Sequence, residues 1–111
     1  MIVNGTYFTK LKNNNGEDFS ITEEEMAKAF ATCLKELRKY KGYTLKQVAE
    51  NTGIPFQTVA RYENGENTPS IVQAFKFSNF YKLDLYDMLL AGYDEEWREK
   101  LFEESTQNTP K

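Results

Sequence analysis

A cluster of polar and aromatic side chains in the middle of the chain offers the most distinctive chemistry in the sequence. The stretch 44–65, TLKQVAENTGIPFQTVARYENG, carries the start and turn signals of two short, tightly joined helices. In the second helix, Val59 and Tyr62 fall on the inner face. An amide and a guanidinium group on the outer face have little structural use, and they suit a helix-turn-helix whose second helix enters a DNA major groove. The outer positions are Phe56, Gln57, Thr58, Ala60 and Arg61.

The composition offers little to catalysis or to metal binding. The 111 residues include no His, which is the commonest general base and the commonest metal ligand. The single cysteine, Cys33, excludes an internal disulfide and a Cys-rich zinc site, and its helical surroundings favour a small buried residue over a reactive thiol. The sequence also lacks a glycine-rich phosphate loop. We therefore expect no enzyme activity, no cofactor and no metal.

The net charge of −3 is unusual for a protein that binds nucleic acid. Its distribution changes that view, because residues 93–111 hold six acidic and three basic residues and the rest of the chain is neutral overall. A neutral domain binds DNA through a local patch, with weak general attraction. The sequence has no run of 18 apolar residues and no signal peptide at its start, so we expect a cytoplasmic protein without membrane contact.

Capping signals predict five helices within residues 22–92. Thr22 and Thr44 each precede a Glu or Gln by three residues, as in a capping box, and Ser70 precedes Gln73 in the same way. Gly42 suits the end of the first helix. The predicted ranges are 22–42, 44–53, 55–64, 70–81 and 85–90, the last ended by Ala91-Gly92.

Apolar residues recur at spacings of three and four in these helices, as expected of faces that pack into one core. In the first helix the buried face is Met26, Phe30, Cys33, Leu34 and Leu37. In the fourth helix the predicted inner face is Ile71, Ala74, Phe75, Ser78 and Tyr81.

The first 21 residues form a separate segment with three alternatives. Residues 6–11 and 19–21 are β-prone and flank an Asn-rich turn, which predicts a small hairpin. A disordered arm is the second alternative. A minor-groove arm with Lys10 and Lys12 as its cations is the third.

After Gly92 the sequence predicts an acidic helix over 95–104, capped by Asp94, and a polar, disordered end. The apolar side of this helix is a candidate surface for a second subunit or another protein, and consists of Trp97, Leu101 and Phe102. The expected organisation is an N-terminal arm or hairpin at 1–21, a helix-turn-helix domain at 22–92 and an acidic helix with its tail at 93–111.

Five segments between Met26 and Leu90 resemble the lambda-repressor-like (Xre/Cro-CI type) helix-turn-helix DNA-binding family. The segments are LKELRKYKGYT (34–44), VAENTGI (48–54), TVARYENG (58–65), TPSI (68–71) and KLDLYDML (82–89). The resemblance implies an all-α, five-helix DNA-binding domain that works as a dimer on a palindromic operator.

The same resemblance implies which residues meet double-stranded DNA. The base-reading candidates are Phe56, Gln57, Thr58 and Arg61. Gln57 would read an adenine through its paired donor and acceptor, and Arg61 a guanine or a phosphate. The candidates for contact with the DNA backbone lie at the basic end of the first helix, in the second helix and in the loop after the third helix. They are Lys39, Lys41, Lys46, Asn64, Asn67 and Thr68.

Among the positions that depart from the family pattern, three weaken the expected contact with phosphate. Leu45 stands where many members have a Gln that contacts phosphate. Pro55 replaces the Ser or Thr that usually caps the third helix, predicted here at 55–64. Glu66 stands where Lys or Arg is common, and phosphate repels it. We therefore carry two hypotheses: a sequence-specific transcriptional regulator, in particular a repressor, and an antitoxin-like or other protein-interaction module that kept the fold.

Overall fold

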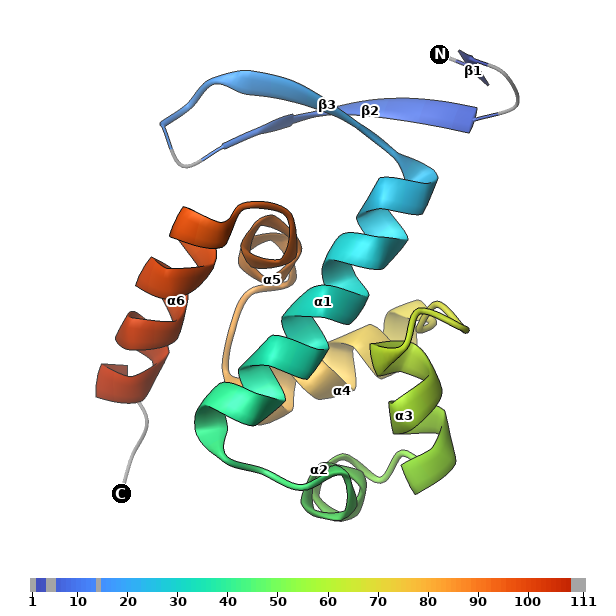
Figure 1. Ribbon diagram of the computed structural model, residues 1–111, viewed down its shortest axis with the longest axis vertical. Helices are drawn as coiled ribbons and strands as arrows, with labels where there is room; N and C mark the ends of the chain where they lie inside the picture. The colour runs from blue at the N-terminus through green and yellow to red at the C-terminus, as the bar shows by residue number, and fades with distance from the viewer. Residues whose placement is uncertain (1, 4–5, 14, 109–111) are drawn as a thin grey trace.

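The computed structural model describes residues 2–3, 6–13 and 15–108 of the chain, in which six helices follow a small antiparallel sheet. Helix α1 runs through the middle of the molecule, the sheet lies across its N-terminal end, and α2 and α3 lie at the opposite end (Figure 1). The strands are β1 (Ile2–Val3), β2 (Thr6–Lys12) and β3 (Asp18–Thr22). The helices are α1 (Glu23–Lys41), α2 (Leu45–Thr52), α3 (Phe56–Glu63), α4 (Ile71–Tyr81), α5 (Leu85–Tyr93) and α6 (Glu95–Asn108).

The N-terminal segment forms the hairpin among the three alternatives. Strands β2 and β3 pair antiparallel, and Asn13 Oδ1 closes the turn by accepting from the amides of Asn15 and Glu17, each at 2.9 Å. A hairpin is marginal alone, and this one packs on the helices through the fully buried Ile21. Of the two cations of the minor-groove alternative, Lys12 pairs with Asp18, and the side chain of Lys10 lies outside the part of the chain that the structure describes.

Two of the three predicted capping boxes are complete. Thr22 and Thr44 each accept from the amide three residues on, and the side chains of Glu25 and Gln47 return a bond to the cap amide. At α4 only half of the box forms, because Ser70 accepts from the amide of Gln73 but receives no reciprocal bond.

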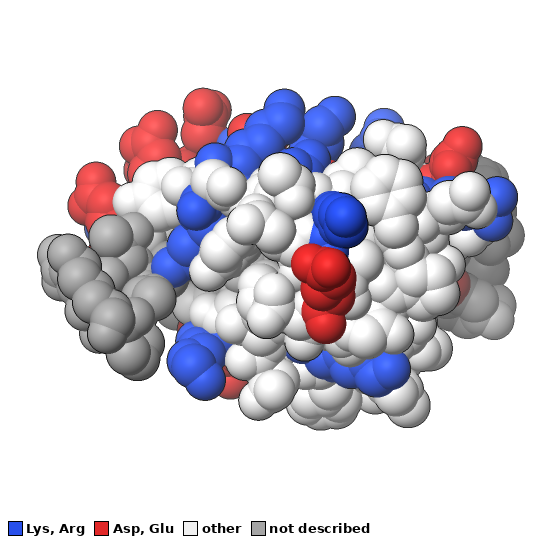
Figure 2. Space-filling model, turned by 90° about the horizontal axis from the view of Figure 1, so that it is seen from below, with Lys and Arg blue, Asp and Glu red and all other residues white. Residues whose placement is uncertain are grey.

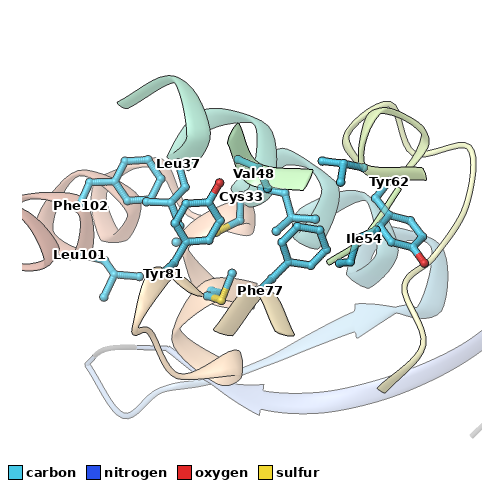
Figure 3. Close-up of a cluster of buried hydrophobic side chains, with 13 residues drawn as sticks. Cys33, Leu37, Val48, Ile54, Tyr62, Phe77, Tyr81, Leu101 and Phe102 are labelled. Carbon is cyan, nitrogen blue, oxygen red and sulfur yellow. The ribbon is translucent and has the colours of Figure 1, made fainter. Parts of the chain in front are cut away.

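One hydrophobic core joins the helices. Cys33, Leu34 and Leu37 of α1 are fully buried against residues of α2, α3, α4 and α5, among them Val48 and Phe77 (Figure 3). Phe102 and Leu101 of α6 are also in this core, each only 5% exposed. The prediction that they offer a surface to a partner is therefore wrong, because they are used to fix α6 on the domain. Trp97, the third residue of that prediction, is partly buried against the same core.

The inner face of α4 differs from the prediction. Phe77 and Tyr81 are buried, but Ile71 and Phe75 are 67% and 58% exposed. The helix is rotated toward Phe77 because this ring is enclosed by the core and meets Tyr62 edge-on. Two apolar side chains of α4 are thus left at the surface.

Helices α5 and α6 are longer than the sequence predicts. Gly92 does not end α5, which continues to Tyr93, because the missing side chain lets α5 lie against the backbone of Ala29. Asp94 caps α6 as predicted, accepting from the amides of Glu96 and Trp97. The predicted disorder is wrong for 105–108, which are helical, and residues 109–111 lie outside the described residues. Within the described part of the chain, no helix is long and apolar enough to span a membrane.

Candidate nucleic-acid interface

A tight turn sets α3 against α2. Gly53 adopts the left-handed conformation with φ of 77°, and its amide closes the end of α2 on the carbonyl of Ala49. The hydroxyl of Thr52 donates to the carbonyl of Val48 at 2.7 Å and accepts from the amide of Ile54 at 3.2 Å. Ile54, only 1% exposed, then inserts into the core. The turn is therefore fixed from both sides, and the direction of α3 with it.

Helix α3 has one face buried in the domain and one face exposed to solvent, which we call its open face. Val59 is fully buried and Tyr62 is 7% exposed. On the other face Phe56 is 51% exposed, and the side chains of Gln57 and Arg61 are also exposed. Since Gln57 and Arg61 are four residues apart, they lie one turn apart on the same side of the helix. The structure thus brings together the three outermost base-reading candidates, with Thr58 half-buried at the edge of the face.

A buried ion pair holds the C-terminal end of α3. Glu63 accepts from Nε of Arg38 through both carboxylate oxygens, at 2.8 and 3.1 Å, and Nη1 of Arg38 donates to the carbonyl of Tyr43 at 3.0 Å. Glu63 is thus turned inward to Arg38 of α1, away from the open face of α3. Sequence reasoning missed this pair, and its only signal is an acidic residue directly after the inward Tyr62.

The pair also affects the core beside it. Burial raises the pKa of the Tyr81 phenol, and the nearby Glu63 carboxylate raises it further, while Arg38 opposes the shift. Tyr81 therefore stays neutral over the range in which proteins work.

The backbone candidates are spread over three elements. Lys46 is exposed in the first turn of α2, where free amides and the helix dipole favour an anion. In the α3–α4 loop the candidates are all exposed, and are Asn64, Asn67 and Thr68. The loop residues line a pocket with Glu24 and Lys28 in the first two turns of α1, whereas Lys46 follows the C-terminal end of α1.

The basic end of α1 contributes less than the sequence suggests. Lys39 lines a cleft of about 520 Å³ between α1 and α6, together with Arg98 and four glutamates. Lys41 is half-buried, and this burial lowers its pKa. Figure 2 shows the end of the molecule at which α2 lies. Most of this face is uncharged, with scattered lysines and arginines and with one acidic group near the centre.

Of the three departures from the family pattern, the structure explains the one at Leu45. Leu45 is partly buried and packs against the core, which accounts for an apolar residue in the first turn of α2. Pro55 occupies the N-cap of α3 without a side-chain hydrogen bond. Glu66 is exposed in the α3–α4 loop, and nothing in the structure explains its charge there.

Comparison with known proteins identifies a family and several relatives that share this part of the chain. Residues 34–88 match the family model described as Helix-turn-helix. The chain is 31% identical over 55 residues to the HTH-type transcriptional regulator SutR of Escherichia coli (strain K12). The aligned span covers 50% of this chain but only 31% of SutR. Over 55 residues it is 34% identical to the uncharacterized HTH-type transcriptional regulator YgzD of Bacillus subtilis (strain 168), covering 50% of this chain and 83% of YgzD.

A third relative comes from an archaeon. An uncharacterized HTH-type transcriptional regulator of Archaeoglobus fulgidus is 26% identical over 66 residues, which cover 60% of this chain and 94% of that protein. No solved structure matches the chain at a comparable level. The span that the family model matches contains the two helices and the turn described above.

Proposed function

The chain belongs to the helix-turn-helix family, and on this premise we propose that it is a DNA-binding transcriptional regulator, a repressor that acts as a dimer on a palindromic operator. The main observation behind the proposal is that α3 has a buried face, which fixes its position, and an exposed open face. Val59, Tyr62 and Glu63 hold the helix, while Phe56, Gln57 and Arg61 make no contribution to the core. A helix held in this way can enter a major groove without losing stability.

Specific reading is assigned to the open face of α3. Gln57 offers a paired donor and acceptor to an adenine, and Arg61 offers a bidentate donor to a guanine. Among the ion pairs that the described residues form, none involves Arg61, so its guanidinium needs no rearrangement to contact DNA. Phe56 and Thr58 supply apolar contact with thymine methyl groups or with flanking sugars.

Positioning on the duplex is assigned to α2 and to the α3–α4 loop. The first-turn amides of α2, at Leu45 and Lys46, would meet one phosphate, with the Lys46 ammonium beside them. Asn64, Asn67 and Thr68 would donate to the backbone on the other side of α3. Because few cations are involved, affinity should fall with salt along a moderate slope.

Selection of bound sequences from a random pool of duplex DNA tests this proposal. Enrichment of a palindrome with half-sites about one helical turn, ~34 Å, apart is the expected outcome. Failure to enrich any sequence over the starting pool would refute sequence-specific binding. Expression of a reporter placed behind the enriched site then distinguishes repression from activation.

A second candidate function is an antitoxin-like module that binds another protein. The observation in its favour is the exposed apolar surface on α4, where Ile71, Val72 and Phe75 are each more than half exposed. The exposed Glu66 in the loop beside α3 also fits poorly with phosphate. This function predicts no sequence enrichment in the selection and a stable complex with a different protein.

A further inference from the structure

We propose that a second copy of the chain docks on an apolar surface formed by α4, α1 and α5, and that this contact makes the dimer. The inference rests on the proposed function, since a palindromic operator requires two copies. The surface has two adjoining parts. The first is a ridge, Ile71 and Phe75 with Val72 beside them, and the second is a groove next to it.

The ridge stands on the first two turns of α4. Ile71 is 67% exposed, Val72 62% and Phe75 58%. Ile71 and Phe75 are four residues apart and so project from the same side of the helix. A folded monomer gains nothing from three large apolar side chains in water, and patches of a few hundred Å² mark interaction sites.

The groove has a volume of about 410 Å³ and a mainly apolar lining, in which Glu23 and Thr68 are the polar residues. At 100° per residue, Ala74 lies between the buried side of α4 and the ridge, so ridge and groove share an edge. The main walls are Met26 and Phe30 of α1, Pro69 of the loop before α4, Ala74 of α4, and Leu85 and Leu89 of α5.

A ridge beside a groove is the shape that a two-fold contact requires. In such a contact the same patch is used twice, so each ridge enters the groove of the other copy. The exposed ridge side chains of two copies would bury on the order of 600 Å² of apolar surface. The groove walls add to this area, which brings the contact toward the roughly 1,200 Å² of a specific interface.

Charges at the two ends of the surface favour the same arrangement. Glu23 lies at the edge of the groove, and the exposed Lys76 follows Phe75 on the side of α4 away from Ala74. A two-fold axis between ridge and groove brings Lys76 of one copy to Glu23 of the other. The surface is thus complementary to itself in charge as well as in shape.

The adjoining side of α5, which carries Tyr86 and Tyr93, is already occupied within the chain. The Tyr86 hydroxyl donates to the carbonyl of Lys12 at 2.6 Å and accepts from its amide at 2.8 Å. Tyr93 stacks on Phe19 of the hairpin, with ring centroids 5.1 Å apart. The hairpin therefore packs against that side, and the half-buried Leu85 and Leu89 line the groove beside it.

Sedimentation equilibrium of the full chain tests the surface. The variant Ile71→Asp/Phe75→Asp should self-associate at least thirty-fold more weakly than the wild type, on the order expected when central anchors are lost. Lys100→Glu, an exposed position on α6 with the same change of net charge, should dimerise as the wild type does. An unchanged dimer in the Ile71/Phe75 variant, or a wild type that stays monomeric at high concentration, would overturn the proposal.

Charge reversal gives a second readout that partial unfolding cannot imitate. Lys76→Glu and Glu23→Lys should each weaken the dimer, and the combined variant should recover most of the loss. If the combined variant is weaker than both single variants, the two side chains do not meet across the axis.

Binding to half of the selected palindrome separates this proposal from the proposed function. The Ile71→Asp/Phe75→Asp variant should keep the half-site affinity of the wild type while losing cooperative binding to the full site. A wild-type dimer that is disrupted by the variant but binds no DNA would support the surface and refute the regulator. Half-site binding by a wild type that never dimerises would support the DNA-binding regulator and refute the dimer surface.

Discussion

Arg38 and Glu63 join the central helix α1 to the last turn of α3. Nε of Arg38 contacts both carboxylate oxygens of Glu63, and the two side chains are 16% and 5% exposed. With Val59 and Tyr62 on the same inner side, the pair fixes how far α3 is rotated about its own axis. The orientation of Gln57 and Arg61 toward a ligand therefore depends on a contact that no ligand touches.

Removal of one partner of this pair should be strongly destabilising. Arg38→Met leaves the Glu63 carboxylate buried without a counter-charge, which costs about 3–5 kcal/mol of the free energy of unfolding. Urea denaturation followed by circular dichroism measures the loss. The double change Arg38→Met/Glu63→Leu should recover a large part of it, since no charge is then left buried.

The exposed pair Lys12–Asp18 provides the matched control. Its side chains are 66% and 63% exposed, although the atoms are also only 2.7 Å apart. Lys12→Met should change the free energy of unfolding by less than about 1 kcal/mol. Equal losses for Arg38→Met and Lys12→Met would show that the buried pair does not hold α3.

Gly92→Ala should destabilise the packing of α5 on α1. A Cβ atom at this position would lie 1.6 Å from the carbonyl oxygen of Ala29, so the two helices must separate. We expect a loss of at least about 3 kcal/mol in urea denaturation. Gly42→Ala, where the strain comes from a φ of 75° and the space is open, should lose only about 1–2 kcal/mol. A smaller loss at Gly92 than at Gly42 would contradict the close approach.

Cys33 should be unreactive in the native protein. It is fully buried, and burial raises the pKa of its thiol to about 12, against a weaker lowering by Arg98. Iodoacetamide at pH 8 should label the chain in urea and leave it unlabelled in buffer. Native labelling at the denatured rate would show that the α1 core opens freely.

The same thiol makes stability fall at alkaline pH. Because the native pKa is raised above the ordinary value of 9.0, the unfolded chain releases the proton first. The stabilisation is complete below pH 9 and is lost as the pH rises toward 12. Tyr81 acts in the same direction. Denaturation midpoints across this range should fall less steeply for Cys33→Ala than for the wild type, and parallel curves would contradict the shift.

Glu66→Lys should strengthen DNA binding without changing its specificity. The exposed carboxylate lies in the loop between Asn64 and Thr68, which we assign to the DNA backbone. Reversal of its charge should raise affinity similarly for all sequences and steepen the salt dependence by about one to two phosphate contacts. Fluorescence anisotropy at several salt concentrations measures both quantities. An unchanged salt slope would place this loop away from DNA.

Local signals in the sequence predicted most of the fold. The caps at Thr22 and Thr44, the Gly53 turn and the α3 face of Val59 and Tyr62 are confirmed, because each depends on neighbours within one or two turns. The hairpin was one of three alternatives, since its stability comes from Tyr86 and Tyr93, which are far away in the sequence.

The errors arose where distant packing decided between similar residues. On α4, Ile71 and Phe75 fit the helical period as well as Phe77 does, and only the position of Tyr62 selects Phe77 for the core. Gly92 looks like a helix end, but it is a contact point for Ala29. The only local signal of the burial of Glu63 was its place directly after the inward Tyr62, because its partner is 25 residues earlier in the chain. At the candidate site, exposure of Gln57 and Arg61 followed from the period alone.

The central claim is that Gln57 and Arg61 on the open face of α3 read DNA. The most direct test is the affinity of Gln57→Ala/Arg61→Ala for the selected palindrome, measured beside its thermal melt and beside Lys100→Ala as a control for one lost cation. We predict that the double variant loses specific binding, by at least about a hundredfold for two base contacts, while its melt and the control remain close to the wild type. Retained operator affinity in a folded double variant would contradict the account.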